Sequence, residues 1–205
     1  MFCPGMLSMK ATGRSQVFNL PNSLTYARVA AVPVVVALLF WPEDYWSRWA
    51  ALGVFVAAAV TDYFDGYFAR AYAQQSQLGR MLDPIADKLL VAASLLMLGA
   101  DGTIEGLHLW AAIVILCREV LVSGLREYLA ELKVGVPVSR VAKWKTVLQL
   151  VALGFLISGP AGEALIAGTH VVGLVFLWIA AGLTIYTGWD YLKVGIATVV
   201  DRDAP

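Results

Sequence analysis

Long apolar stretches separated by short polar segments make up most of the chain. Six of these stretches approach the twenty or so residues that a helix needs to cross the hydrocarbon core of a bilayer. They lie at 24–40, 49–71, 81–100, 107–132, 141–158 and 171–194. The pattern therefore predicts an all-α fold, an integral membrane bundle of six transmembrane helices.

The first residues do not follow this pattern. Residues 1–14 are expected to form a poorly ordered tail. The segment 15–23, SQVFNLPNS, is too short and too mixed to span a membrane, so we expect it to lie at the interface. The predicted division is a tail with an interfacial segment over 1–23 and a transmembrane domain over 24–205.

Composition agrees with a membrane protein. Of the 205 residues, 60% are hydrophobic, and the mean hydropathy is +0.72. The formal net charge is zero, so no basic excess indicates a nucleic-acid partner. His108 and His170 lack a second ligand at metal spacing and are expected to be interfacial or core histidines. Cys117 lies in an apolar run and is expected to be a small core residue.

The charges between the apolar stretches are distributed unevenly, which predicts the topology. Acidic residues dominate the segments after the first, third and fifth predicted helices, whereas Lys and Arg dominate the other side. The acidic residues are Glu43, Asp44, Asp101, Glu105 and Glu163, and the basic ones include Lys10, Arg14, Lys133 and Arg140. By the positive-inside rule, both termini are expected to be cytoplasmic.

Four aspartates interrupt apolar sequence between residues 62 and 87. Left unpaired in a bilayer, they would cost roughly 10–14 kcal/mol, at about 2.5–3.5 kcal/mol each. At about 100° per residue, Asp62 and Asp65 share one helical face, and Asp83 and Asp87 line one stripe of the next helix. Two such helices facing each other can gather the four carboxylates around one or two hard cations, and Mg²⁺ or Mn²⁺ suits all-oxygen ligands.

The same segment carries a longer pattern, D-x2-D-G-x2-A-R-x8-G-x3-D-x3-D. Its fixed positions are Asp62, Asp65, Gly66, Ala69, Arg70, Gly79, Asp83 and Asp87. At every one of them the segment, called the signature below, resembles that of the CDP-alcohol phosphotransferase family. A purely structural network, with the aspartates paired to neighbouring Arg and Lys, would leave Gly66, Ala69 and Gly79 unexplained.

This resemblance implies an enzyme with two bound Mg²⁺ or Mn²⁺ ions. Asp62, Asp65 and Asp83 are then expected to hold the metal centre, with Asp87 adjoining it as a ligand and as the general base. The donor, CDP-diacylglycerol, is expected to contact Gly66, Ala69, Arg70, Gly79, Asp62 and Thr25. Gly66 and Gly79 have no Cβ, so they let the nucleotide approach the helices closely. For Thr25, a helix-start role is the alternative.

Basic residues in the fourth and fifth predicted helices indicate an anion pocket. They are Arg118, Arg126, Lys143 and Lys145. The two arginines lie eight residues apart, about 80° around the helix axis, and guanidinium groups suit bidentate phosphate contacts. The alternative is that Glu119 and Glu127 neutralise the arginines while the lysines extend to lipid phosphates. Because Arg118 lies deep in its helix, we favour the pocket.

Three further segments, PNSLTYAR, REVLVSGLRE and KWKTVLQ, are similar to those of family members whose acceptor is sn-glycerol 3-phosphate. The implied reaction converts CDP-diacylglycerol and sn-glycerol 3-phosphate into phosphatidylglycerol phosphate and CMP, at the cytoplasmic face of a bacterial inner membrane. The resemblance also implies a homodimer surrounded by membrane lipids.

Other functions remain open at this point. A sibling enzyme using inositol phosphate, inositol, serine or another alcohol would share the signature. Membrane prenyltransferases also bind diphosphates through aspartates, but they space them differently and lack G-x2-A-R. A divalent-cation transporter is the non-enzyme alternative, although such sites tend to lie near the midplane between repeats, and this sequence shows no repeat.

Overall fold

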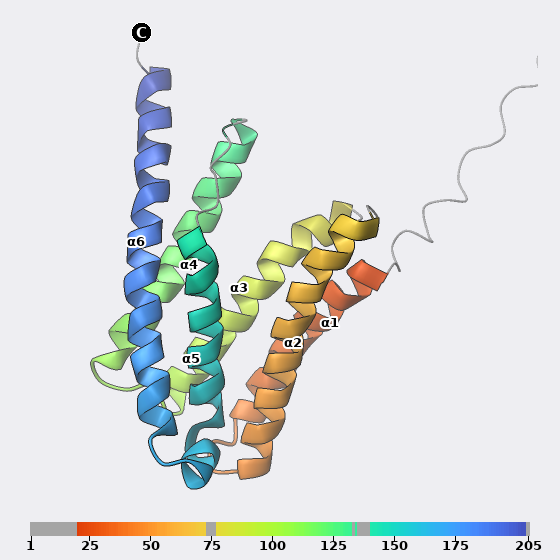
Figure 1. Ribbon diagram of the computed structural model, residues 1–205, viewed down its shortest axis with the longest axis vertical. Coiled ribbons are helices and arrows are strands. Elements are labelled where there is room, and N and C mark those ends of the chain that lie inside the picture. Colours follow the sequence, from red (N-terminus) through yellow and green to blue (C-terminus); the bar gives the residue numbers. More distant parts are fainter. Residues whose placement is uncertain (1–19, 73–76, 133, 135–139, 204–205) are drawn as a thin grey trace, which may run out of the picture.

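A computed structural model describes residues 20–72, 77–132, 134 and 140–203, with side chains described for 24–61, 82, 85–132, 134 and 141–198. Every regular element in these ranges is a helix (Figure 1), which confirms the predicted all-α fold for the described residues. The helices are α1 (Leu20–Leu39), α2 (Tyr45–Tyr72), α3 (Gln77–Ala100), α4 (His108–Glu131), α5 (Arg140–Leu165) and α6 (Thr169–Asp203). Each contains most or all of one predicted apolar stretch.

Three helices contain described segments long and apolar enough to cross a membrane, at His108–Glu131, Val141–Leu165 and Thr169–Thr198. The apolar part of α1, Leu24–Leu39, is shorter. α2 and α3 continue into the signature, where most side chains lie outside the described residues, so the number of six spans stays a prediction. Most of the predicted interfacial segment also lies outside them, although residues 20–23 form the start of α1.

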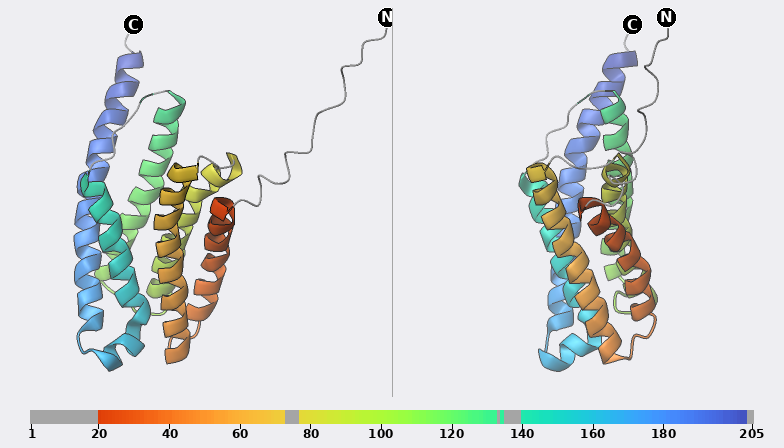
Figure 2. Two further views of the ribbon diagram at one scale, coloured as in Figure 1. Left: turned by 45° about the vertical axis from the view of Figure 1, so that its right-hand side comes forward. Right: turned by 90° about the vertical axis from the view of Figure 1, so that its right-hand side faces the viewer.

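The helices form two groups of three. α1 packs on α2 and α3, α6 packs on α4 and α5, and α2 joins the groups by packing on α5. The groups meet at the end of the bundle where α1 connects to α2, α3 to α4 and α5 to α6, and they diverge toward the other end (Figures 1 and 2). We call the latter the signature end, because α2 ends and α3 begins there, and the former the opposite end.

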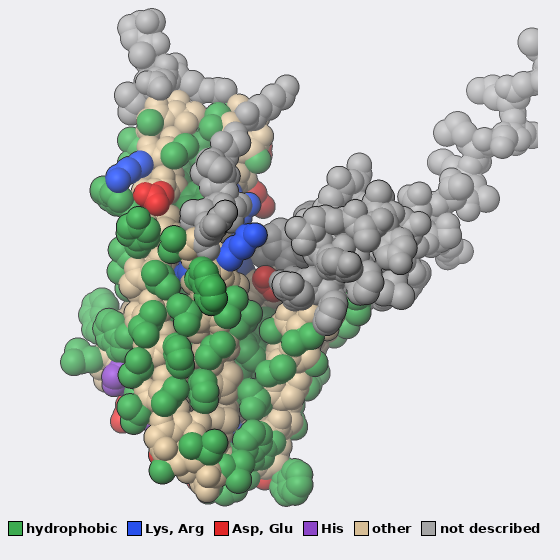
Figure 3. Space-filling view, in the orientation of Figure 1, with side chains coloured by type: hydrophobic (Ala, Val, Ile, Leu, Met, Phe, Trp, Pro, Cys, Tyr) green, Lys and Arg blue, Asp and Glu red, His purple; other side chains and the backbone are tan. Residues whose placement is uncertain are grey.

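The core lies where the two groups meet. Buried apolar side chains from all six helices fill it, among them Val35, Phe55, Leu95, Ile115 and Leu153. Figure 3 shows hydrophobic side chains covering the lower part of one face, while the Lys and Arg side chains that stand out on this face lie in its upper half, toward the signature end.

A break in α5 shapes the opposite end. Gly159 has φ 46° and ψ −129°, outside the helical region, and Pro160 follows it. The side chain of Arg48, from α2, fills the break: Nη1 donates to the carbonyl of Ile157 at 3.4 Å. A Cβ at position 159 would lie 3.1 Å from the same nitrogen, so only glycine suits both the backbone angle and the contact.

Arg48 also ties this break to the connection between α3 and α4. Its Nη2 donates to Asp101 Oδ2 at 2.5 Å and to Thr103 Oγ1 at 3.2 Å, while Nε donates to the carbonyl of Pro42 at 3.2 Å. Arg48 is only 1% exposed, and the Asp101 side chain 4%. One buried guanidinium thus joins α2, α5 and the α3–α4 loop.

The two histidines each contact a group of a neighbouring element, whereas the cysteine of α4 is exposed. His170 Nε2 lies 2.8 Å from the carbonyl of Thr103, and the Trp178 indole donates to His108 Nδ1 at 3.0 Å, both at the opposite end. The expectation that Cys117 is a core residue was wrong, because its side chain is exposed on α4. A membrane helix is apolar on all sides, so hydrophobicity does not indicate which side is buried.

Candidate active site

The signature lies on the ends of two helices that follow each other in the chain. The C-terminal turns of α2 carry Asp62, Asp65, Gly66, Ala69 and Arg70, and the first turns of α3 carry Gly79 and Asp83. Their side chains lie outside the described residues, so the predicted metal and donor contacts stay predictions. Among the side chains that are described, no group of three or more His, Cys, Asp or Glu could hold a metal ion.

Asp87 is the member of the signature whose side chain is described. It is 46% exposed, and its Oδ1 lies 4.0 Å from Nη1 of Arg28, a fully buried side chain of α1. Thr25, one turn earlier on α1, is also buried, at 1% exposure. Asp87 therefore lies near the buried guanidinium of Arg28 while its own carboxylate remains accessible. Both a metal ligand and a proton acceptor need such access.

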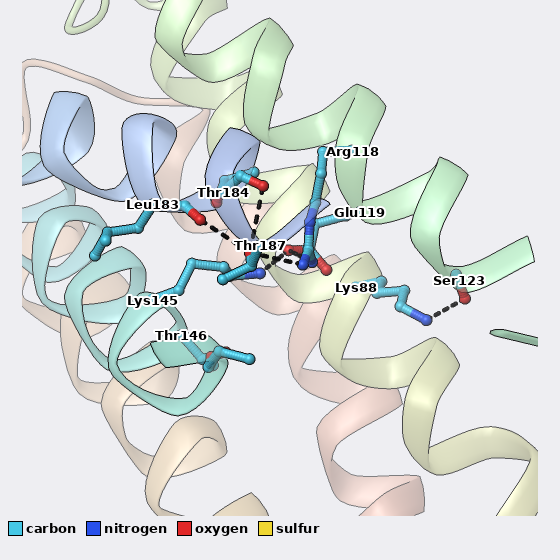
Figure 4. Close-up of polar contacts among 10 residues, drawn as sticks. Lys88, Arg118, Glu119, Ser123, Lys145, Thr146, Leu183, Thr184 and Thr187 are labelled. Carbon is cyan, nitrogen blue, oxygen red and sulfur yellow. Dashed lines mark hydrogen bonds and ion pairs between the residues drawn. The ribbon is translucent and has the colours of Figure 1, made fainter. Parts of the chain in front are cut away.

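Arg118 is fixed by groups from two helices. Its Nη2 donates to Thr187 Oγ1 of α6 at 2.9 Å, and its Nη1 lies 3.5 Å from Glu119 Oε1 (Figure 4). The guanidinium carbon also lies 6.0 Å from the ring centre of Tyr191, within the range of a cation–π contact. The deep arginine of α4 is thus held inside the bundle rather than extended to its surface.

Lys145 of α5 reaches the same carboxylate. It is 4% exposed, and its Nζ donates to Glu119 Oε1. Arg118 and Lys145 therefore converge from α4 and α5 on Glu119. Two of the four predicted cations thus come together and Glu119 pairs with both, while their role as an anion pocket stays a prediction. Arg126 and Lys143 are exposed, and within the described residues neither makes a hydrogen bond or an ion pair.

Sequence reasoning considered Lys88, which follows Asp87 on α3, only as a counter-ion for the aspartates and not as a site residue. Its Nζ donates to Ser123 Oγ of α4, across a cavity of about 310 Å³ that also includes Glu119 and Glu127 in its lining. Lys88 thereby links α3, which carries Asp83 and Asp87, to α4, which carries Arg118. The signal available in the sequence was a charged residue directly after Asp87, at the start of an apolar run.

The family comparison covers this region. The model for CDP-alcohol phosphatidyltransferases matches residues 18–186. The chain belongs to this family. The match takes in the whole signature as well as Arg118, Lys145 and Lys88, and it ends just before Thr187. Because members of the family are transferases, the expectation of an enzyme is confirmed, and the cation-transporter alternative falls away.

Individual relatives within the CDP-alcohol phosphatidyltransferase family are similar over most of the chain. A Rickettsia typhi protein named CDP-diacylglycerol–glycerol-3-phosphate 3-phosphatidyltransferase is 49% identical over 175 residues, covering 85% of this chain and 96% of the relative. A Cereibacter sphaeroides protein of the same name is 37% identical, and the match covers 90% of this chain and 99% of the relative. An Arabidopsis thaliana protein, which bears the name with the suffix 2, is 38% identical, and the match covers 87% of this chain and 80% of the relative.

Proposed function

We propose that this chain is a membrane phosphatidyltransferase that makes phosphatidylglycerol phosphate and CMP from CDP-diacylglycerol and sn-glycerol 3-phosphate. The observation that carries the proposal is the convergence of partly buried Arg118 and buried Lys145 on one carboxylate. Two cations held inside the bundle, in a chain whose signature is proposed to bind a diphosphate, suit an acceptor that itself carries a phosphate. The names of the relatives agree with this acceptor.

The signature supplies the proposed metal centre. Asp62, Asp65 and Asp83, with Asp87 adjoining, would hold two Mg²⁺ or Mn²⁺ ions, for which carboxylate oxygens are suitable ligands. Of the four signature aspartates, Asp87 is the one whose side chain is described, and at 46% exposure its carboxylate is accessible to an ion. When bound, such ions neutralise the negative charge of a diphosphate and of the departing phosphate.

The donor would lie against the same helices. Gly66 and Gly79 allow the cytidine diphosphate to approach the helix backbone, and Ala69 packs there because it is small. Arg70 is proposed to hold the diphosphate. Asp62 and buried Thr25 would complete the donor contacts.

Phosphate binding positions the acceptor for attack. Arg118 and Lys145, assisted by Arg126 and Lys143, would donate hydrogen bonds to the phosphate of sn-glycerol 3-phosphate in place of those now made to Glu119. Asp87 then accepts the proton of the 1-hydroxyl group. The hydroxyl oxygen forms a bond to the β-phosphorus of CDP-diacylglycerol, the bond between that phosphorus and the bridging oxygen breaks, and CMP leaves with the electron pair.

This chemistry requires the signature end to face the cytoplasm, where both the acceptor and CMP are soluble. α1 begins and α6 ends at this end (Figure 2), as expected if both termini are cytoplasmic. The proposed location is a bacterial inner membrane, with the chain as a homodimer among membrane lipids.

Release of CMP by the purified protein in detergent tests the function. CDP-diacylglycerol and Mg²⁺ or Mn²⁺ are supplied, and the acceptor is varied among sn-glycerol 3-phosphate, inositol phosphate, inositol and serine. We expect turnover only with sn-glycerol 3-phosphate. Turnover only with another alcohol would refute the acceptor assignment and leave the signature chemistry intact, whereas no release with any acceptor would refute the proposal as a whole.

A further inference from the structure

The last helix, α6, makes a specific contact with the proposed acceptor pocket. Thr187 is 2% exposed, and its hydroxyl donates to the carbonyl of Leu183 at 2.9 Å. That bond uses the only hydroxyl hydrogen, so the lone pairs of Oγ1 face the Arg118 Nη2 at 2.9 Å. The hydroxyl of Thr187 is thus set up as an acceptor for the guanidinium (Figure 4).

Two neighbours on α6 complete the contact with Arg118. A Cβ at Gly188 would lie 3.1 Å from Arg118 Cγ and 3.4 Å from its Nε, so the absence of a side chain lets the arginine lie close to the helix. Tyr191, which is 6% exposed, places its ring 6.0 Å from the guanidinium carbon. At helical spacing these three residues fall within about 100° of one another around the axis.

The contact leaves part of the guanidinium unsatisfied. Within the described residues, the buried Nε of Arg118 has no hydrogen-bond partner. An unmade hydrogen bond from a buried donor is unfavourable, and such groups are rare in folded proteins. A phosphate oxygen is an acceptor of the kind that an arginine N–H binds well, so a bound acceptor would satisfy this group.

We propose that Thr187, together with Gly188 and Tyr191, positions Arg118 for the phosphate of the acceptor, so that α6 sets the affinity for sn-glycerol 3-phosphate. This inference rests on the proposed function. It concerns residues beyond position 186, where the family match ends. Thr187 touches Arg118 and not the reacting atoms, so it is a positioning residue.

The test compares two threonines one turn apart on α6. Thr187→Val removes the hydroxyl that Arg118 uses and keeps the shape of the side chain. Thr184→Val is the matched control, because Thr184 is fully buried and its Oγ1 has no hydrogen-bond partner within the described residues. For Thr187→Val we expect KM for sn-glycerol 3-phosphate to rise about tenfold, the scale of one hydrogen bond to a charged group. KM for CDP-diacylglycerol should stay within about twofold of the wild type, since only the acceptor pocket changes.

A conservative variant and a steric one separate positioning from folding. Thr187→Ser retains the hydroxyl and should restore KM to within about twofold of the wild type. Gly188→Ala keeps Thr187 but presses on the stem of Arg118, so it should also raise KM for the acceptor. Gly182→Ala, with nothing within 4 Å of the added methyl group, should not. Thermal unfolding of every variant, with and without sn-glycerol 3-phosphate, reports folding and acceptor binding independently of turnover.

The outcomes are distinguishable. The inference is overturned if Thr187→Val and Thr184→Val have the same KM for sn-glycerol 3-phosphate while Arg118→Ala raises it. It is also overturned if Arg118→Ala has no effect, because the pocket then lies elsewhere. Failure of the proposed function appears separately, as the absence of CMP release by the wild-type protein with sn-glycerol 3-phosphate.

Discussion

Replacing Arg48 with methionine removes a buried cation while keeping a flexible apolar stem, which is shorter than the arginine side chain. The substitution abolishes the hydrogen bonds to Pro42, Ile157, Asp101 and Thr103. It also leaves the Asp101 carboxylate, whose side chain is 4% exposed, without its counter-ion. Removal of one partner from a buried ion pair typically costs about 3–5 kcal/mol.

The structure places the expected loss toward the lower end of that range. Asp101 Oδ1 still accepts the backbone N–H of Thr103 at 2.8 Å after the substitution, so the carboxylate keeps one hydrogen bond. At about 3 kcal/mol, and roughly 2–4 °C per kcal/mol for a chain of this size, the unfolding midpoint should fall by about 6–12 °C.

Circular dichroism during heating in detergent, at one fixed scan rate, measures this midpoint. Arg126→Met is the matched control, because Arg126 is exposed and makes no hydrogen bond or ion pair within the described residues. Asp101→Asn should fall between the two, since the single amide oxygen can still accept from Arg48 or from the Thr103 N–H, but not from both. Midpoints for Arg48→Met and Arg126→Met within about 2 °C of each other would refute the reasoning that Arg48 joins the helices at the opposite end.

Three further predictions concern the break in α5 and the catalytic end. Gly159→Ala should destabilise the protein by about 1–3 kcal/mol, because its φ of 46° is strained for alanine; Gly53→Ala, in a helix with open space around the added methyl group, should be neutral or stabilising in the same thermal assay. Asp87→Asn should reduce the rate of CMP release about 10²–10⁴-fold through loss of the proton acceptor, and near-native turnover would exclude Asp87 as the base. Chelation with EDTA should abolish CMP release, and Mg²⁺ or Mn²⁺ should restore it; full activity after exhaustive chelation would argue against a metal centre.

The helices were predictable because a bilayer permits few alternatives. A segment that crosses lipid must satisfy its backbone hydrogen bonds internally, so apolar stretches near twenty residues predict helices with little dependence on tertiary contacts. The fifth stretch was predicted to end at 158, where the structure has the break at Gly159. The sixth helix was predicted to end at 194 but runs to Asp203, because charged residues such as Asp190 and Lys193 interrupt an apolar stretch without ending a helix.

The candidate site was predictable where charges stand out against apolar sequence. Arg118 and Lys145 were selected for that reason, and the structure brings them together on Glu119. Thr187 could not be selected in this way, because threonine is common in membrane helices and nothing in an apolar helix indicates which side meets its neighbour. The geometry of the metal ligands stays a prediction, since those side chains lie outside the described residues.

The hydrogen bonds of Arg48 hold the two groups of helices together at the opposite end, so any change in the angle between the groups pivots there. Because the groups meet at the opposite end, a change in the angle between them moves the signature end most. From His108 to Arg118, α4 rises about 15 Å at 1.5 Å per residue. A tilt of only about 10° about the start of α4 would therefore shift Arg118 by about 2.5 Å, close to the length of a hydrogen bond. The rigidity of the opposite end therefore determines how precisely the Arg118 guanidinium is positioned.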